Sequence, residues 1–222
     1  MHGVVDELGS ITEQLLILGN DSYPPHFGKA QTPGSTPFHW TSINSAVNFQ
    51  NNLFDHVVYH EEIIRASHYI VSQLRYFSKT QTFNAVHLRR GNFLKWHFPE
   101  EASHLSVVKS TIQKYLRTNE LFYVATNERD PEWIKGLQEI GGVFWNDLFT
   151  TYKISLAEFP FVEKMIMFEM FYGMIEQHIA KHARKFIGSD CSTMTGQILT
   201  LRRKIHGAEE YVTLTGVHHR AL

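Results

Sequence analysis

Short apolar runs alternate with segments of helical periodicity through most of this chain, and that alternation limits the fold more than any other feature. Four of these runs are predicted strands: Thr82–Arg90, Leu121–Thr126, Gly142–Trp145 and Lys185–Ile187. The segments between them repeat apolar residues three or four positions apart, as one face of a helix does. Strands that alternate with helices predict an α/β domain with a Rossmann-like, mostly parallel sheet and helices on both faces.

The expected helices differ in length, and the ends of the chain look less regular. The helical segments are Glu61–Phe77, Glu101–Arg117, Pro131–Leu137, Glu163–Ala183 and Met194–Arg203. Tyr211–Leu214 is expected to add an edge strand. Residues 20–50 are rich in Pro, Gly, Ser, Asn and Thr, which is typical of loop.

Composition indicates a globular protein without a strong electrostatic preference for a partner. Hydrophobic residues make up 43% of the 222 residues, and the formal net charge is −1. A nearly neutral chain has no general attraction for nucleic acid, so any anion site has to be local. No run reaches about 18 apolar residues, so we expect no membrane span. The single cysteine, Cys191, excludes an intrachain disulfide.

The stretch from Phe186 to Arg203 predicts a strand, a tight turn and a helix. An apolar run stops at Gly188, and a turn rich in Ser and Thr follows. Ser192 or Thr193 is a natural N-cap, because its hydroxyl can accept from the unpaired N–H groups of the first helical turn. Those N–H groups and the helix dipole also favour an anion such as phosphate. A well-capped helix without a ligand is the alternative.

Polar residues follow three of the predicted strands. They lie at His87–Gly91, at Ala125–Glu128 and at Gly188–Thr193. In parallel α/β sheets, ligands bind beyond the carboxyl ends of the strands. The sequence therefore predicts an anion pocket where these three strand ends meet.

Motifs for several other chemistries are missing. The chain contains no G-x4-G-K-[ST], no G-x-G-x-x-G, no G-x-S-x-G and no D-x-D. His56 and His60, and likewise His178 and His182, have the i,i+4 spacing that suits a metal on one helix face. Neither pair has an obvious third ligand nearby in the sequence, so we predict no metal site.

Three segments resemble the GDP-fucose protein O-fucosyltransferase family. They are AVHLRRGNF at 85–93, FYVATNE at 122–128 and IEQHIAKHARKFIGSDCSTMTGQILTLRR at 175–203. Their order and spacing are similar to that family across about two-thirds of the chain, Tyr59–Arg203. The family has the two-domain GT-B fold, and these motifs belong to its C-terminal, nucleotide-binding half.

The resemblance implies an inverting glycosyltransferase that moves fucose from GDP-fucose to a Ser or Thr hydroxyl of a protein acceptor. This chain would supply mainly the donor-binding half. Residues 1–50 would be a linker or the remnant of an N-terminal domain, 51–215 the GDP-sugar-binding domain and 216–222 a tail. The family works in the lumen of the endoplasmic reticulum or Golgi, although residues 1–20 lack the order of a signal peptide.

The resemblance also implies roles for individual residues. Arg89 matches the arginine that reaches the pyrophosphate, where a guanidinium forms two hydrogen bonds and stabilises the charge on departing GDP. Such an arginine could replace the metal that a D-x-D motif would hold, so no metal or other cofactor is expected. The remaining expected contacts with the nucleotide sugar are His87 beside Arg89, Asn127, Glu176 at the guanine, Ser192, Thr193 and Met194 at the phosphate turn, and Arg202 or Arg203 from the helix end.

The chain departs from the family pattern at two of these strand ends. Asn92 and Asn127 stand where many members have Asp, an exchange that keeps size and loses charge. No counterpart of the N-terminal motif is found, so no acceptor base is assigned. Two alternatives stay open: a degenerate or truncated relative that binds a GDP-sugar or a protein partner without catalysis, and a nucleotide-binding α/β enzyme of another transfer class.

Overall fold

The computed structural model describes residues 59–91, 104–117, 120–166, 172–189, 192–206, 211–214 and 216–218. All of them belong to one compact unit of the chain. The linker or remnant expected at 1–50 lies outside the described residues, as do Asn92 and Cys191. None of the described helices combines the length and the apolar character that crossing a bilayer requires.

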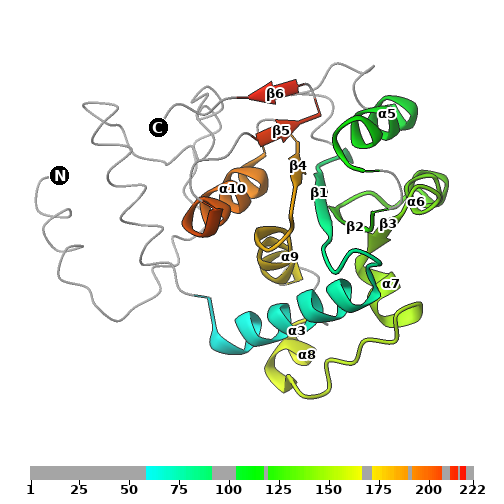
Figure 1. Cartoon of the computed structure of the whole chain (residues 1–222). Helices are drawn as coiled ribbons and strands as arrows, with labels where there is room; N and C mark the ends of the chain where they lie inside the picture. Colours follow the sequence, from blue (N-terminus) through cyan, green and yellow to red (C-terminus); the bar gives the residue numbers. More distant parts are fainter. Residues whose placement is uncertain are drawn as a thin grey trace, which may run out of the picture. The chain divides into compact units, whose positions relative to one another are not determined.

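Six strands of the described part of the chain form one sheet in the order β3-β2-β1-β4-β5-β6 (Figure 1). The strands are β1 (Asn84–Leu88), β2 (Phe122–Thr126), β3 (Gly142–Phe144), β4 (Phe186–Gly188), β5 (Tyr211–Thr213) and β6 (Gly216–His218). Neighbours from β3 to β5 pair in parallel, and β6 pairs with β5 in antiparallel fashion. The predicted α/β class and mostly parallel sheet are therefore confirmed.

One helix, α3 (Glu61–Phe77), precedes β1, and the others connect the parallel strands. The connecting helices are α5 (Leu105–Tyr115), α6 (Pro131–Gln138), α7 (Trp145–Thr150), α8 (Pro160–Ile166), α9 (Tyr172–Lys181) and α10 (Thr193–His206). The start of α6 shows why such segments are helical: Pro131 occupies the first turn, and the Asp130 carboxylate accepts from the Glu132 N–H at 3.0 Å. In α8, the Glu62 carboxylate of α3 accepts from the first-turn N–H groups of Phe161 and Val162.

The pleat of the strands divides the core into two layers. Ala85, Tyr123 and Phe186 face α3, α9 and α10, whose buried residues include Ile70, Ile179 and Ile198. Val86, Val124 and Ile187 face the opposite way, toward α5 and α6. Figure 1 shows α9 and α10 on one side of the sheet and α5 and α6 on the other. Burial of such aliphatic side chains contributes about 1.5–3 kcal/mol each, which holds both layers on the sheet.

The order of the strands creates a topological switch point. From β1 the chain moves outward through β2 to β3, and it then returns to place β4 on the other side of β1. The connections on the two sides of β1 consequently run in opposite directions. Ligands of open α/β sheets bind at the carboxyl ends of the two strands that flank such a point. In this chain those strands are β1 and β4.

Some boundaries differ from the sequence-based expectation. Tyr211–Leu214 was expected at the sheet edge, but β5 lies between β4 and β6, because Gly216–His218, expected in the tail, adds an antiparallel strand. The helix predicted over Glu163–Ala183 corresponds to α8 and α9, and residues 167–171 between them lie outside the described part. The short helix α7 was not predicted, since six residues carry little periodic signal.

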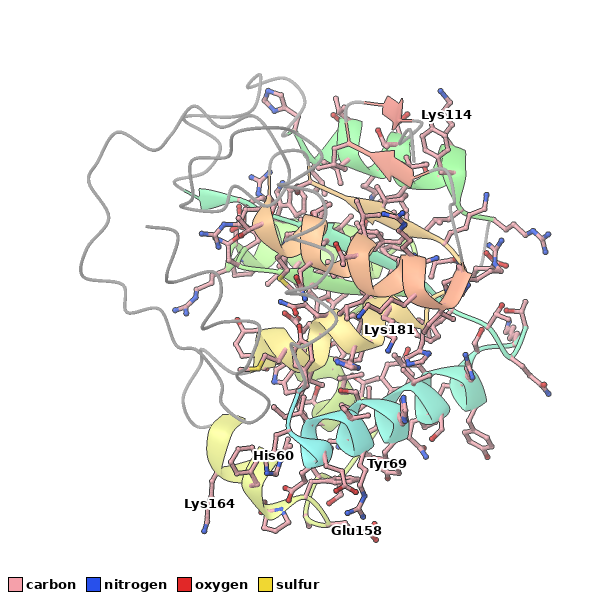
Figure 2. The ribbon with its side chains drawn as sticks, turned by 90° about the vertical axis from the view of Figure 1, so that its left-hand side faces the viewer. His60, Tyr69, Lys114, Glu158, Lys164 and Lys181 are labelled. Carbon is pink, nitrogen blue, oxygen red and sulfur yellow. The ribbon has the colours of Figure 1, made fainter. Side chains whose placement is uncertain are left out.

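A group of histidines lies at the contact between α3 and α9. Figure 2 shows α9, where Lys181 is labelled, between α10 and α3, where Tyr69 is labelled. The rings of His68 and His182 meet edge to face, with their centroids 5.0 Å apart. Both ring nitrogens of His178 are buried without a hydrogen-bond partner in the structure. Burial, reinforced by the charge of Lys181, lowers the pKa of His178 to about 4.

We expect this contact to make the unfolding free energy fall in acid. The native pKa of His178 lies below the value of about 6.5 in an unfolded chain, so the unfolded state binds a proton that the native state excludes. Stability is therefore complete above about pH 6.5 and is lost as the pH falls toward about 4. Replacing His178 with Phe keeps a ring in place and removes the proton site.

Urea unfolding of the unaltered chain and of His178→Phe at about pH 7 and about pH 5 measures the effect. The variant should lose less stability between the two pH values than the unaltered chain does. Equal losses in both proteins would show that His178 is not the group that titrates.

Candidate functional site at the carboxyl ends of β1 and β4

Hydroxyl groups from both neighbouring strands hold the carboxyl end of β1. The Ser189 hydroxyl, just after β4, accepts from the Arg89 N–H at 2.8 Å and donates to the His87 carbonyl at 3.1 Å. From β2, the Thr126 hydroxyl donates to the Leu88 carbonyl at 2.7 Å. Ser189 is buried, and its bond to the His87 carbonyl forms away from solvent, where hydrogen bonds are strongest. The backbone from His87 to Arg89 is therefore fixed at the switch point.

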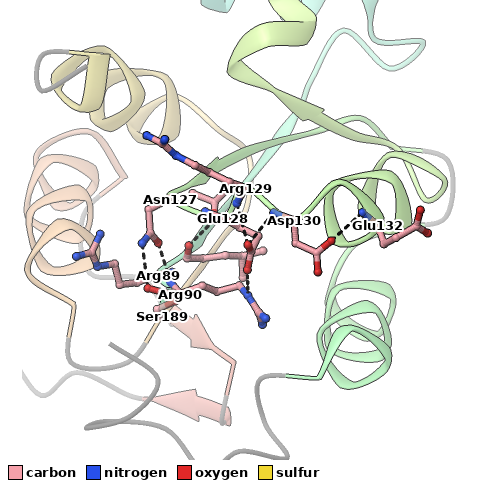
Figure 3. Close-up of polar contacts among 10 residues, drawn as sticks. Arg89, Arg90, Asn127, Glu128, Arg129, Asp130, Glu132 and Ser189 are labelled. Carbon is pink, nitrogen blue, oxygen red and sulfur yellow. Dashed lines mark hydrogen bonds and ion pairs between the residues drawn. The ribbon is translucent and has the colours of Figure 1, made fainter. Parts of the chain in front are cut away.

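The next residue, Arg90, is held by the segment after β2. The Asn127 amide accepts from the Arg90 N–H at 2.8 Å and donates to the Arg90 carbonyl at 2.9 Å. The Arg90 side chain forms an ion pair with Glu128, and its guanidinium lies 4.0 Å from the centre of the Trp133 ring of α6. Figure 3 shows the contacts of Arg90 with Asn127 and Glu128. Arg90 is consequently tied to the α6 side of the sheet.

Arg89 differs from Arg90 in having an exposed side chain. Within the described part of the chain, its guanidinium has no hydrogen bond, ion pair or ring contact. Figure 3 shows the two arginine side chains leaving the strand end in opposite directions. The alternation along β1 places Arg89 on the same side as His87, which is the side of α10. A fixed backbone thus presents a cation that no described side chain pairs, beside the switch point.

His87 connects β1 to α10. Its Nδ1 lies 2.8 Å from the Thr195 hydroxyl. Burial, and secondarily the charge of Arg89, lower the pKa of His87 to about 3, so the imidazole is neutral at physiological pH. Gly188 permits this approach, because a Cβ there would lie 2.4 Å from the Thr195 Cγ2. The sequence does not predict the contact of Thr195 with His87 or those of Ser189 with the backbone of His87 and Arg89.

The first turn of α10 lies at the carboxyl end of β4, as the sequence predicts. The helix begins at Thr193, which is exposed, and Ser192 precedes it with its carbonyl accepting from the Gly196 N–H at 3.0 Å. Met194 is half-buried and packs against the core, so its side chain supports the turn. The N–H groups of a first helical turn lack partners within the helix and attract anions. They provide this end of the sheet with a second electropositive element beside Arg89.

Glu176, expected at a guanine, is a core residue of the described unit. It is buried in α9 and accepts a hydrogen bond from the Tyr123 hydroxyl of β2 at 2.9 Å. Burial raises the pKa of Glu176 to about 8, so the carboxyl is mostly protonated at neutral pH. Guanine recognition requires a carboxylate that accepts two hydrogen bonds. The surroundings of Glu176 therefore do not support that role.

The surroundings of Arg202, expected to contact the nucleotide sugar from the helix end, do not support that role. The Arg202 side chain is 1% exposed, and its Nη1 donates to the carbonyls of Ala180 at 3.0 Å and Ala183 at 2.6 Å. These carbonyls lie at and just beyond the carboxyl end of α9, where helical partners run out. Arg202 also lies nine residues after Thr193, about 13 Å along the helix axis. It stabilises the packing of α10 on α9 and does not reach the strand ends.

The two histidine pairs with i,i+4 spacing form no metal site among the described residues. His178 lies in the contact between α3 and α9, and His56 lies outside the described residues. Among the described side chains, no three His, Cys, Asp or Glu residues gather closely enough to hold a metal ion.

Comparison with known proteins gives no family assignment. No protein-family model matches the sequence, and no curated protein matches it significantly.

We predict that Arg202 stabilises the fold and that its exposed neighbour Arg203 does not. Arg202→Met keeps much of the side-chain volume and leaves the carbonyls after α9 without their donor. The free energy of unfolding should fall by about 2–4 kcal/mol, because unsatisfied buried acceptors are costly. The neighbouring exposed residue provides the control: Arg203→Met should change stability by no more than about 0.5 kcal/mol in the same urea titration. Equal effects of the two changes would contradict the assignment.

Proposed function

We propose that the described unit binds a GDP-sugar at the carboxyl ends of β1 and β4, as the donor-binding half of an inverting protein O-fucosyltransferase. The observation that carries this proposal is the exposed Arg89 guanidinium, unpaired within the described part of the chain, on a strand end that Ser189 fixes. An unpaired cation at a topological switch point is suited to an anionic ligand. The motif resemblance over 85–93, 122–128 and 175–203 supports GDP-fucose as that ligand.

Two elements provide the chemistry that a nucleoside diphosphate needs. The planar Arg89 guanidinium can donate two parallel hydrogen bonds to phosphate oxygens. The first-turn N–H groups of α10, after Ser192, offer backbone donors and the positive end of the helix dipole. The neutral His87 adds no charge, so its contribution is a hydrogen bond or a surface against the sugar or nucleotide.

In the proposed reaction, an acceptor Ser or Thr hydroxyl attacks the anomeric carbon of fucose from the face opposite to GDP. The C–O bond to the diphosphate breaks, and the electron pair leaves with GDP, so the anomeric configuration inverts. Negative charge grows on the diphosphate as this bond breaks, and a fixed Arg89 stabilises that charge most strongly in the transition state. The acceptor hydroxyl also loses a proton, and no described residue is assigned as the base.

Calorimetric titration with GDP, UDP and ADP tests the proposal. GDP should bind more tightly than the other two. Arg89→Ala should weaken GDP binding by about 1.5–3 kcal/mol, or roughly 10- to 150-fold, because it removes a charge-assisted contact.

Arg117→Ala is the matched control. Arg117 is an exposed arginine that lines a cavity of about 610 Å³ at the amino ends of β2 and β3, away from the proposed site at the carboxyl ends. It should leave GDP binding unchanged. If Arg117→Ala weakens binding and Arg89→Ala does not, the nucleotide binds in that cavity and the proposed site is wrong.

A second candidate function is binding of the GDP-sugar without transfer. It is favoured by Asn127, which stands where the resembling family commonly has Asp. Both candidates predict GDP binding, so only an assay for fucose transfer to a protein acceptor separates them.

A further inference from the structure

We propose that Asn127 is a positioning residue for Arg89 and that this chain requires an amide, not a carboxylate, at that position. The inference rests on the proposed function, because it concerns how Arg89 is presented to phosphate. By this inference, having Asn at 127, where many members of the family that the chain resembles have Asp, supports ligand binding and does not weaken it. In this chain, the Asn127 amide matches the backbone groups of Arg90 that it binds.

The chemistry of the two contacts fixes which groups are needed. The Arg90 N–H is a donor and requires an acceptor, which the Asn127 Oδ1 supplies at 2.8 Å. The Arg90 carbonyl is an acceptor and requires a donor, which the Asn127 Nδ2 supplies at 2.9 Å. A carboxylate has acceptors only, so Asp would make the first bond and place a second oxygen against the carbonyl. Only an amide of this size satisfies both backbone groups.

The following residue adapts the backbone to this contact. Gly91 has φ +72°, in the left-handed region that side-chain-bearing residues rarely adopt. A Cβ at Gly91 would lie 3.3 Å from the Asn127 Nδ2, so the glycine also gives the amide room. The turn after β1 therefore allows Asn127 to bind both the N–H and the carbonyl of Arg90.

The effect reaches the ligand through Arg89. Ser189 binds the N–H of Arg89, and Asn127 binds the N–H of the next residue, so the peptide groups on both sides of the Arg89 Cα are held, the one between the two arginines by Asn127. The Glu128 carboxylate and the Trp133 ring draw the Arg90 side chain to the α6 side. With this peptide fixed, the Arg89 side chain leaves the strand toward α10, where the proposed phosphate binds (Figure 3). Without Asn127 the peptide can rotate, and part of the binding free energy is spent on reorienting Arg89.

The test is a double-mutant cycle on the full chain, with GDP as the ligand. Asn127→Ala should weaken GDP binding about tenfold, consistent with the loss of one or two hydrogen bonds. In an Arg89→Ala background the same change should have little further effect, because the group that Asn127 positions is gone. A merely structural role would reduce affinity by the same factor in both backgrounds.

Asn127→Asp tests the requirement for an amide. It should weaken GDP binding at least as much as Asn127→Ala does. Its affinity relative to the unaltered chain should stay low at about 0.5 M KCl, where direct repulsion between a carboxylate and phosphate is largely screened. Amide hydrogen exchange at Arg90 provides a readout without ligand: Asn127→Ala, which removes the acceptor of the Arg90 N–H, should accelerate it while the melting temperature changes little.

The outcomes separate the inference from the function on which it rests. Failure of the unaltered chain to bind GDP would overturn the proposed function, and this inference with it. GDP binding that Asn127→Asp maintains or strengthens would overturn the inference alone. Equal losses from Asn127→Ala with and without Arg89 would do the same.

Discussion

The carboxyl end of β1 depends on polar side chains that its two neighbouring strands contribute. Ser189 from the β4 side and Thr126 from β2 bind the backbone between His87 and Arg89, and Asn127 continues the series at Arg90. A strand end without such partners would expose unpaired backbone groups and sample several conformations. These bonds instead leave one exposed arginine with a defined direction. The binding site that we propose follows from that constraint.

The topology explains why these groups come together. Because β1 lies between β2 and β4 at the switch point, residues 87–91, 126–128, 188–189 and 192–195 converge although these segments are far apart in the chain. Close approach at the other side of the site depends on Gly188, which lets Thr195 of α10 reach His87. The charges then divide between the two faces of the sheet. Arg90 is bound by Glu128 on the α6 side, and Arg89 stays available on the α10 side.

The sequence predicted the strand ends well because local patterns determine where strands stop. Apolar runs that end in polar residues place His87, Arg89 and Ser192 at the carboxyl edge without any knowledge of tertiary contacts. The partners of these residues could not be predicted in this way, since Thr195 reaches His87 only through helix packing. The burial of Arg202 and Glu176 could not be predicted either, because charged residues are usually exposed and nothing local indicates that these two are buried.

A crystal structure of the chain with GDP would test the central claim most directly. We expect the diphosphate between the Arg89 guanidinium and the first turn of α10, with the Asn127 contacts to Arg90 unchanged. GDP bound instead in the cavity at the amino ends of β2 and β3, beside Arg117, would contradict the claim. So would a diphosphate at the strand ends that makes no contact with Arg89.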